Sequence, residues 1–172
     1  MKALERRERI LEILKVGEPI TGAELARRLG VSRQVIVQDV AILRAGGTDI
    51  LATPQGYVLA PREEGYRRTF ACRHDMEGME QELLIIVDNG GRVLDVVVEH
   101  PVYGELRGFL MLSSRREVYE FLENLQRSGA KPLYTLTEHG VHLHTVTAAK
   151  EEALEAIEGA LARAGILLID AR

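Results

Sequence analysis

The chain contains a single cysteine, Cys72, so it cannot form an intrachain disulfide bond, and this usage fits a reducing cytoplasm. No apolar run approaches the roughly 18 residues that a membrane-spanning helix needs. The first ten residues, MKALERRERI, are charged and helical in pattern, unlike a secretory signal. We therefore expect a cytoplasmic protein with no membrane partner.

The composition excludes a disordered chain, because 46% of the residues are hydrophobic and 28% are charged. A length of 172 residues allows one medium domain or two small ones. The net charge of −4 is unevenly distributed: nine Lys/Arg against seven Asp/Glu give +2 in residues 1–60, and thirteen against nineteen give −6 in residues 61–172. The first segment is therefore better suited to bind a polyanion.

The first sixty residues show the pattern of consecutive helices with short turns. Residues 3–16 carry apolar side chains at i, i+3 and i+4 spacing, and Gly17 ends that helix. Thr21 and Glu24 have the spacing of a capping box before a second helix, which Gly30 closes.

A third helix follows almost directly, with Ser32 as its N-cap and a glycine pair at its end. A helix, a glycine-containing turn and another helix outline a helix-turn-helix. Ile36, Val40 and Leu43 form the expected buried stripe, which leaves a polar surface at the start of the third helix. Arginine and glutamine can pair with guanine and adenine edges, and valine can contact a thymine methyl group. The candidate base-contacting residues are Arg33, Gln34, Val37 and Gln38.

Residues 50–53 and 57–59 are expected to form two short strands around a type I turn that contains Pro54 and Gly56. A hairpin after the third helix is a wing, so residues 1–60 are predicted to form a winged helix-turn-helix that binds double-stranded operator DNA. Gln55, at the tip of the wing, is a further candidate contact. Small helical units without a nucleic-acid function are also common, and they are the competing interpretation.

The stretch GVSRQVIVQDVAILR resembles the recognition helix of the biotin-repressor type of winged helix, and the resemblance covers about the first third of the chain. The biotin ligase itself is excluded, because the 112 residues that remain (172 minus 60) cannot hold its large catalytic domain. They also lack a glycine-rich loop of the adenylation type.

Residues 60–66, APREEGY, combine proline, glycine and charges without periodicity, so we place a linker there. Residues 67–172 are predicted to form an α+β domain with a mostly antiparallel sheet and helices packed on one face. The other face is partly open, and a second subunit of a homodimer is a plausible cover. Helices are expected at 76–89, 114–128 and 150–163, and strands at 67–74, 92–100, 105–112, 133–137, 140–147 and 165–169.

Two histidines lie two residues apart in the strand sequence GVHLHTV, so His142 and His144 point to the same face, roughly 6.5–7 Å apart at Cα. His74 lies where a strand gives way to a helix, and Glu82 borders the apolar stripe of that helix. Such a set could hold a borderline divalent metal such as Zn, Ni, Co, Fe or Mn. An ordinary polar sheet face is the alternative, and spacing alone does not distinguish Glu82 from Glu80.

Three motifs in order, RHD to EQELL, NGGRVLDVVVEHPVYGELRG and GVHLHT, resemble the three-histidine domain that follows a winged helix in niacin-responsive repressors of NAD biosynthesis and niacin uptake. The resemblance implies that His74, Glu82, His142 and His144 bind a transition metal, and that nicotinic acid acts as co-repressor. One departure is Asp75, which could compete for the ion. His139, in a turn, has no role that the resemblance carries over.

Residues His100, Tyr103 and Arg107 in EHPVYGELRG could line the effector pocket, or they could fix a tight turn and a subunit contact. Two other functions stay open. A metal sensor, in which the ion is the signal, would show DNA affinity that tracks metal concentration. A metalloenzyme fused to a DNA-binding domain is disfavoured, because no second acid–base pair and no nucleophile with a partner base is visible.

Overall fold

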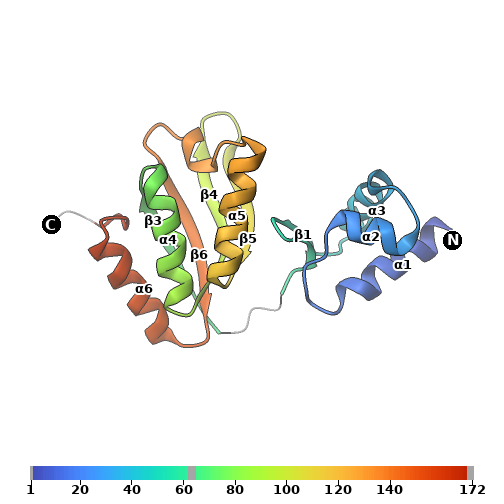
Figure 1. The fold of residues 1–172 in the computed structure, drawn as a ribbon, viewed down its shortest axis with the longest axis horizontal. Coiled ribbons are helices and arrows are strands. Elements are labelled where there is room, and N and C mark those ends of the chain that lie inside the picture. Colours follow the sequence, from blue (N-terminus) through green and yellow to red (C-terminus); the bar gives the residue numbers. More distant parts are fainter. Residues whose placement is uncertain (1, 62–64, 170–172) are drawn as a thin grey trace. The chain divides into compact units, whose positions relative to one another are not determined.

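The computed structural model describes residues 2–61 and 65–169. The chain divides between residues 63 and 64 into two compact units. Each unit has its own apolar core and its own sheet (Figure 1). Within the described residues, no helix is both long enough and apolar enough to cross a membrane.

The first unit contains three helices followed by a two-stranded hairpin. Thr21 and Ser32 cap the second and third helices as predicted, because their hydroxyl groups accept the backbone amides of Glu24 and Val35. The capping box at Thr21 is incomplete, since the carboxylate of Glu24 binds arginines further along the same helix. The elements are α1 (Ala3–Leu14), α2 (Gly22–Leu29), α3 (Arg33–Ala45), β1 (Ile50–Thr53) and β2 (Gly56–Leu59).

The wing is attached to the helices through the backbone between α1 and α2. Ile20 and Tyr57 exchange two backbone hydrogen bonds of 2.9 and 2.8 Å. The segment between α1 and α2 therefore pairs with β2 through one antiparallel bridge. Gly56 makes this approach possible: it has a φ of +128°, and a Cβ there would lie 2.4 Å from the backbone of Ile20. The predicted winged helix-turn-helix fold is confirmed.

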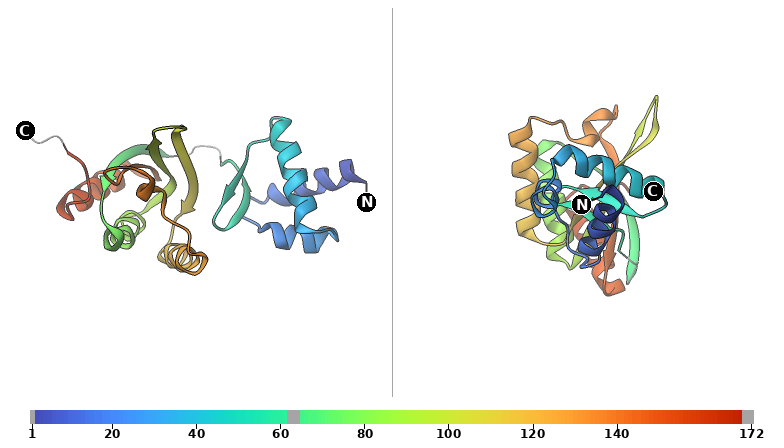
Figure 2. Two further views of the ribbon diagram at one scale, coloured as in Figure 1. Left: turned by 90° about the horizontal axis from the view of Figure 1, so that it is seen from above. Right: turned by 90° about the vertical axis from the view of Figure 1, so that its right-hand side faces the viewer.

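The second unit is a four-stranded sheet in the order β3-β6-β4-β5 in which every neighbouring pair is antiparallel. The helices α4, α5 and α6 cover one face, as the edge-on view in Figure 2 shows. The predicted α+β fold with one-sided helices is confirmed. The elements are β3 (Tyr66–Arg73), α4 (Met76–Asp88), β4 (Gly91–His100), β5 (Gly104–Leu112), α5 (Arg115–Ser128), the 3-10 helix η1 (Leu133–Leu136), β6 (Val141–Ala148) and α6 (Glu151–Arg163).

The connection β3-α4-β4 is a split crossover, because β6 is inserted between the two strands that α4 joins. This topology places α4 across the helix-covered face of β6. Leu83 and Ile86 of α4 are buried in the same cluster as Val146 of β6 and Leu154 of α6. The core thus forms between the helices and the sheet, and it brings one face of β6 under α4.

Two predicted strands are wrong. Most of the expected strand at 133–137 is the 3-10 helix η1 (Leu133–Leu136), because the carbonyl of Pro132 accepts both the amide and the hydroxyl of Thr135 and closes a tight turn. Up to residue 169, the predicted final strand makes only one isolated bridge, between Leu167 and Cys72. The segment still covers the outer edge of β3, with the amide of Leu168 donating to the carbonyl of Ala71 at 2.8 Å.

Candidate functional site

Three histidines and one glutamate converge beneath α4, and the split crossover explains why. His74 is the first residue after β3, and β6 runs antiparallel beside that strand with His142 opposite Cys72. His144 follows on the same face of β6, because strand side chains alternate. Glu82 lies on the second turn of α4, which crosses above β6. Side chains separated by up to 70 positions therefore meet in one place.

The imidazole Nε2 atoms of all three histidines point at the carboxylate of Glu82. His74 Nε2 lies 2.7 Å from Glu82 Oε2, His144 Nε2 lies 3.2 Å from the same oxygen, and His142 Nε2 lies 3.2 Å from Oε1. The four side chains are 1–3% exposed. One donor atom each from His74, Glu82 and His142 lie within 4.8 Å of one another. The structure therefore brings together all four predicted metal ligands.

The contacts of the Nδ1 atoms show which nitrogen of each imidazole is protonated, and therefore which nitrogen is available as a ligand. Each Nδ1 faces a backbone carbonyl, at 2.6 Å for His74, 2.9 Å for His142 and 2.7 Å for His144. A carbonyl only accepts, so each Nδ1 carries a proton, and a neutral ring then presents a lone pair at Nε2. Three lone pairs facing a carboxylate repel one another unless protons or a cation lie between them. The outer hydrogen bonds are those that orient metal-bound imidazoles in proteins.

The donor atoms fit a transition metal. Nitrogen and oxygen ligands at about 2.1 Å from an ion, and at right angles, lie about 3.0 Å from each other. The observed contacts between the imidazole nitrogens and the carboxylate oxygens are 2.7–3.3 Å. Three imidazoles and one carboxylate are the ligands that borderline divalent ions prefer. These four residues could hold such an ion and leave positions open to a further ligand.

The protonation equilibria of the cluster follow from the same contacts. Burial would lower the pKa of His74 and of His144, but the hydrogen bonds and charge of Glu82 raise both pKa values above the usual range. Burial would likewise raise the pKa of Glu82, but the charge of His144 and the imidazole hydrogen bonds hold it well below its usual range. Without a metal, the raised pKa values of His74 and His144 favour protons that balance the buried carboxylate.

Sequence reasoning missed three residues that support the cluster. A Cβ at Gly78 would lie 2.4 Å from the Cβ of His74, so only glycine allows His74 to pack against the first turn of α4. Gly140, with a φ of +68°, supplies the carbonyl that binds His142. The ring of Tyr134, in η1, packs 4.9 Å from the ring of His74. The unusual backbone conformations of glycine were the available signal for Gly140.

Nearby polar residues are occupied elsewhere. Asp75 caps α4 by accepting the amide of Gly78 at 3.0 Å, so its carboxylate has a structural partner outside the cluster. Glu80 is exposed on the far side of α4, whereas Glu82 is fully buried. The structure thus separates the two glutamates that spacing left equivalent.

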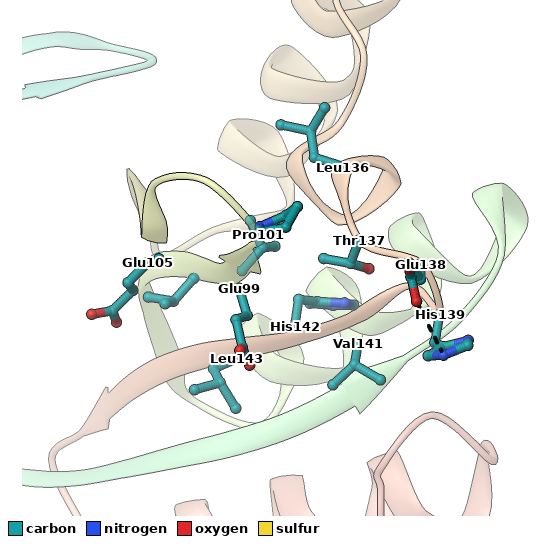
Figure 3. Close-up of a pocket in the computed structure, with 13 residues that line it drawn as sticks. Glu99, Pro101, Glu105, Leu136, Thr137, Glu138, His139, Val141, His142 and Leu143 are labelled. Atoms are coloured by element: carbon teal, nitrogen blue, oxygen red, sulfur yellow. Dashed lines mark ion pairs between the residues drawn. The ribbon is translucent and has the colours of Figure 1, made fainter.

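A pocket of about 850 Å³ opens beside the cluster, where β4 ends and β6 begins (Figure 3). His142 belongs both to the pocket lining and to the cluster. The lining is otherwise apolar on β6 and acidic at its rim, where Glu138 pairs with His139 at 3.9 Å. Its lining residues from β4, β5 and their turn are Val97, Val98, Glu99, Pro101, Gly104 and Glu105, and those from η1 to β6 are Leu136, Thr137, Glu138, His139, Val141, His142 and Leu143.

The three predicted effector-contacting residues lie next to this pocket without lining it. His100 Nδ1 faces the amides of Val102 and Tyr103, both at 3.2 Å, which closes the turn between β4 and β5. The Tyr103 ring packs on His100 and is 74% exposed. Arg107 donates to Asp95 at 3.0 Å and to Glu105 at 3.4 Å. In this conformation, the side chains of His100 and Arg107 therefore have structural partners.

The candidate DNA-binding residues lie on one helix face and on the wing. Arg33, Gln34, Val37 and Gln38 are all exposed on the first two turns of α3. Val37 is 37% exposed, so its apolar side chain is accessible on this face of the helix. Gln55 is half-buried, because Thr53 accepts its backbone amide within the turn of the wing.

A buried ion pair that sequence reasoning missed holds α3 against α1. Asp39 lies on the inner face of α3 and is 2% exposed. Its carboxylate accepts from Arg6 Nε at 2.5 Å and from Arg7 Nη1 at 3.4 Å. The guanidinium of Arg6 is always charged, and the hydrogen bond to Asp39 raises its pKa further. An aspartate in the apolar stripe of the third helix was the available signal.

Comparison with known proteins agrees with both units. Residues 6–58 match the model of an HTH domain, and residues 67–170 match the model of the 3H domain. A protein of Thermotoga maritima named "Probable transcription repressor NiaR" is 48% identical over 167 residues, which cover 95% of each chain. The "Transcription repressor NadR" of Bacillus subtilis is 45% identical over 170 residues, which cover 96% of this chain and 94% of that protein. Both relatives are named as regulators and neither as an enzyme.

Proposed function

We propose that this chain, which belongs to the family of transcription repressors that includes NiaR and NadR, represses genes of NAD biosynthesis and niacin uptake as a metal-containing homodimer with nicotinic acid as co-repressor. The proposed regulatory role of the second unit is supported mainly by one observation. The Nε2 atoms of three histidines converge on Glu82, and each Nδ1 atom contacts a backbone carbonyl. DNA binding through α3 and the wing follows from the winged helix.

The metal is proposed to be the anchor of the effector. His74, Glu82, His142 and His144 would hold a divalent ion such as Ni, Zn, Fe, Co or Mn. The ion would supply positive charge and an open coordination position for a carboxylate or a ring nitrogen. Nicotinic acid has both groups.

The charge of the pocket supports this role. Glu99, Glu105 and Glu138 line the pocket, and none of its lining residues is lysine or arginine. An anionic effector that enters therefore finds carboxylates at the rim and positive charge only at histidines or at a bound ion. A carboxylate-bearing ligand should bind with useful affinity only when the metal is present.

The DNA-binding half is proposed to work as a pair. Two winged helices on one dimer can read half-sites separated by about 34–36 Å, or by multiples of that distance. Arg33, Gln34, Val37, Gln38 and Gln55 would contact the DNA. The co-repressor is proposed to bind best to the dimer geometry that matches the operator, and it then shifts the population toward that geometry. DNA affinity should therefore rise when the co-repressor is present.

The test is DNA affinity measured under four conditions. A duplex selected from a random library would be titrated with metal-loaded or metal-stripped protein, each with and without nicotinic acid. The proposal expects tight binding only when the metal and nicotinic acid are both present. Tight binding with metal alone would instead identify a metal sensor. Binding that ignores both additions would overturn the regulatory half and leave only a DNA-binding protein.

Matched variants connect the result to the site. His144→Ala should abolish the response to nicotinic acid, whereas Glu80→Ala changes an exposed residue of α4 outside the cluster and the pocket and should preserve it. Light scattering of the same samples measures the oligomeric state. A monomer at the concentrations that bind DNA would contradict the homodimer.

A further inference from the structure

A buried carboxylate at the centre of the sheet lies directly behind the histidine cluster. Asp95, in the middle of β4, is 2% exposed. Such a group requires hydrogen-bond partners, because an unpaired buried charge is strongly unfavourable. Its Oδ1 accepts the backbone amide of Thr145 at 3.0 Å, and its Oδ2 accepts from Arg107 Nη1 at 3.0 Å. Its own backbone carbonyl accepts from His144 Nδ1 at 2.7 Å.

The strand pairing around Asp95 is irregular on both sides. Between β4 and β6, Val93 pairs with Val146 and the next pair is Val97 with Leu143, so β4 has one residue more than its partner there. Toward β5, the pairing also shifts between Val93 and Asp95. In β5 itself, opposite this shift, Met111 has a φ of +54°. Asp95 thus lies within a β-bulge, a feature that interrupts the ladder and redirects local groups.

The bulge supplies a free backbone carbonyl for His144, which the other two histidines find outside the strands. His74 and His142 contact the carbonyls of Asp75 and Gly140, two residues that lie outside the strands and their pairing. His144 lies inside β6, where neighbouring carbonyls normally serve the strand pairing. At the bulge, the carboxylate of Asp95 takes the amide of Thr145, and the carbonyl of Asp95 is turned toward His144.

We propose that Asp95 is a positioning residue for His144, and that Arg107 holds the Asp95 side chain in place from the opposite face of the sheet. This inference rests on the proposed metal site. The Arg107 side chain is 40% exposed, and it lies on the face opposite the helices, paired in register with Val97. The bulge network, defined as Asp95, Arg107, His144 and Thr145, therefore joins that open face to the candidate metal centre.

The first test measures cobalt binding, because the visible spectrum of Co²⁺ reports on the geometry of its ligands. Arg107→Gln and Asp95→Asn keep the Asp95 carbonyl but loosen the contacts that hold it in place. Each should weaken Co²⁺ binding about 10- to 100-fold, as substitutions of groups that orient metal ligands do, and should alter the absorption spectrum. Arg107→Lys keeps the charge and should restore most of the affinity. Arg115→Gln removes the ion pair between Arg115 and Asp88 on the helix side and should change neither quantity.

The second test uses metal-free protein and does not depend on metal binding. Nitrogen-15 NMR of the imidazoles reports which ring nitrogen carries the proton. In Arg107→Gln, the protonation pattern of His144 should change, whereas those of His74 and His142 should stay as in the unmodified protein. Those two rings also show that the variant is folded. If Asp95→Asn does not fold, Arg107→Gln, which changes a half-exposed side chain, decides the question.

The outcomes separate this inference from the function on which it rests. If the unmodified protein binds Co²⁺ and both variants match its affinity, spectrum and imidazole pattern, Asp95 has no positioning role and the inference is wrong. If the unmodified protein binds no Co²⁺ at these histidines, the proposed function fails. In that case the NMR comparison still decides whether the bulge orients His144.

Discussion

Asp39 in the first unit and Glu82 in the second are both buried acidic side chains, and basic groups balance them in different ways. Asp39 in the winged helix is matched by Arg6 and Arg7, which are charged at every physiological pH. Glu82 in the second unit is matched by three imidazoles, which are charged only when protonated. The first arrangement is a permanent structural pair. The second has nitrogen and oxygen donors that could hold a metal ion in place of protons, which fits the regulatory role proposed above.

The largest expected effect comes from removing the acidic member of the second arrangement. Metal-binding free energies of four-ligand sites are about 10–16 kcal/mol, so the loss of one ligand should cost about 3–4 kcal/mol, or about 10²- to 10³-fold in affinity. We expect this loss for Glu82→Gln in a competition titration with Zn²⁺ or Ni²⁺. Glu80→Gln changes an exposed glutamate on the same helix and should leave affinity unchanged. Equal affinities for the two variants would remove Glu82 from the site.

The same change in the winged helix should act on stability and not on metal binding. Asp39→Asn leaves Arg6 without its buried partner, and we expect a cost of about 2–3 kcal/mol to the first unit, because both arginines keep some contact with water. Hydrogen exchange of α1 and α3 would localise the loss. Metal affinity measured on the same sample should not change. A loss confined to the second unit would contradict the assignment of Asp39 as a structural anchor.

Sequence alone predicted which four side chains converge in the cluster better than it predicted the residues that support them. The two-residue period of a strand places His142 and His144 on one face, and the family resemblance selects Glu82. The support depends on long-range geometry that no local pattern contains. Gly78 matters only because His74 folds back onto α4, and Asp95 only because the pairing of β4 with both neighbours is shifted. The strand predicted at residues 133–137 was wrong because of a local effect. A turn at Pro132 overrides the strand-like composition of this segment.

A glycine substitution tests whether the fit of His74 matters to the cluster. Gly78→Ala introduces a Cβ at 2.4 Å from the Cβ of His74, so one of the two residues must move. We expect about a 10- to 100-fold loss of metal affinity, similar to the disturbance of other groups that orient a ligand. Gly159→Ala in α6 is the matched control, because there the nearest atom is the mobile end of Arg163. Unchanged affinity in Gly78→Ala would show that His74 tolerates displacement.

The exposed residues at the start of α3 can be tested for base contacts. If Arg33 and Gln38 read bases, their replacement by alanine should each cost about 1–3 kcal/mol on the selected duplex and relax its sequence preference. The measurement is competition between the selected duplex and single-base variants, at one fixed salt concentration. Glu12→Ala on the exposed side of α1 serves as the comparison. Unchanged sequence preference in the double variant would remove these two residues from the contact surface.

The smallest expected effect is a dependence on pH in the second unit. Because Glu82 raises the pKa values of His74 and His144, their contribution to metal-free stability is complete below the unfolded value of about 6.5 and is lost as pH rises through the folded pKa values. Metal binding displaces the same protons, so metal affinity should rise with pH over this range. Unit-resolved hydrogen exchange between pH 6 and 8.5, with chelator or with Zn²⁺, should therefore show opposite slopes in the second unit. Parallel slopes with chelator and with Zn²⁺ would mean that Glu82 is not balanced by titrating histidines.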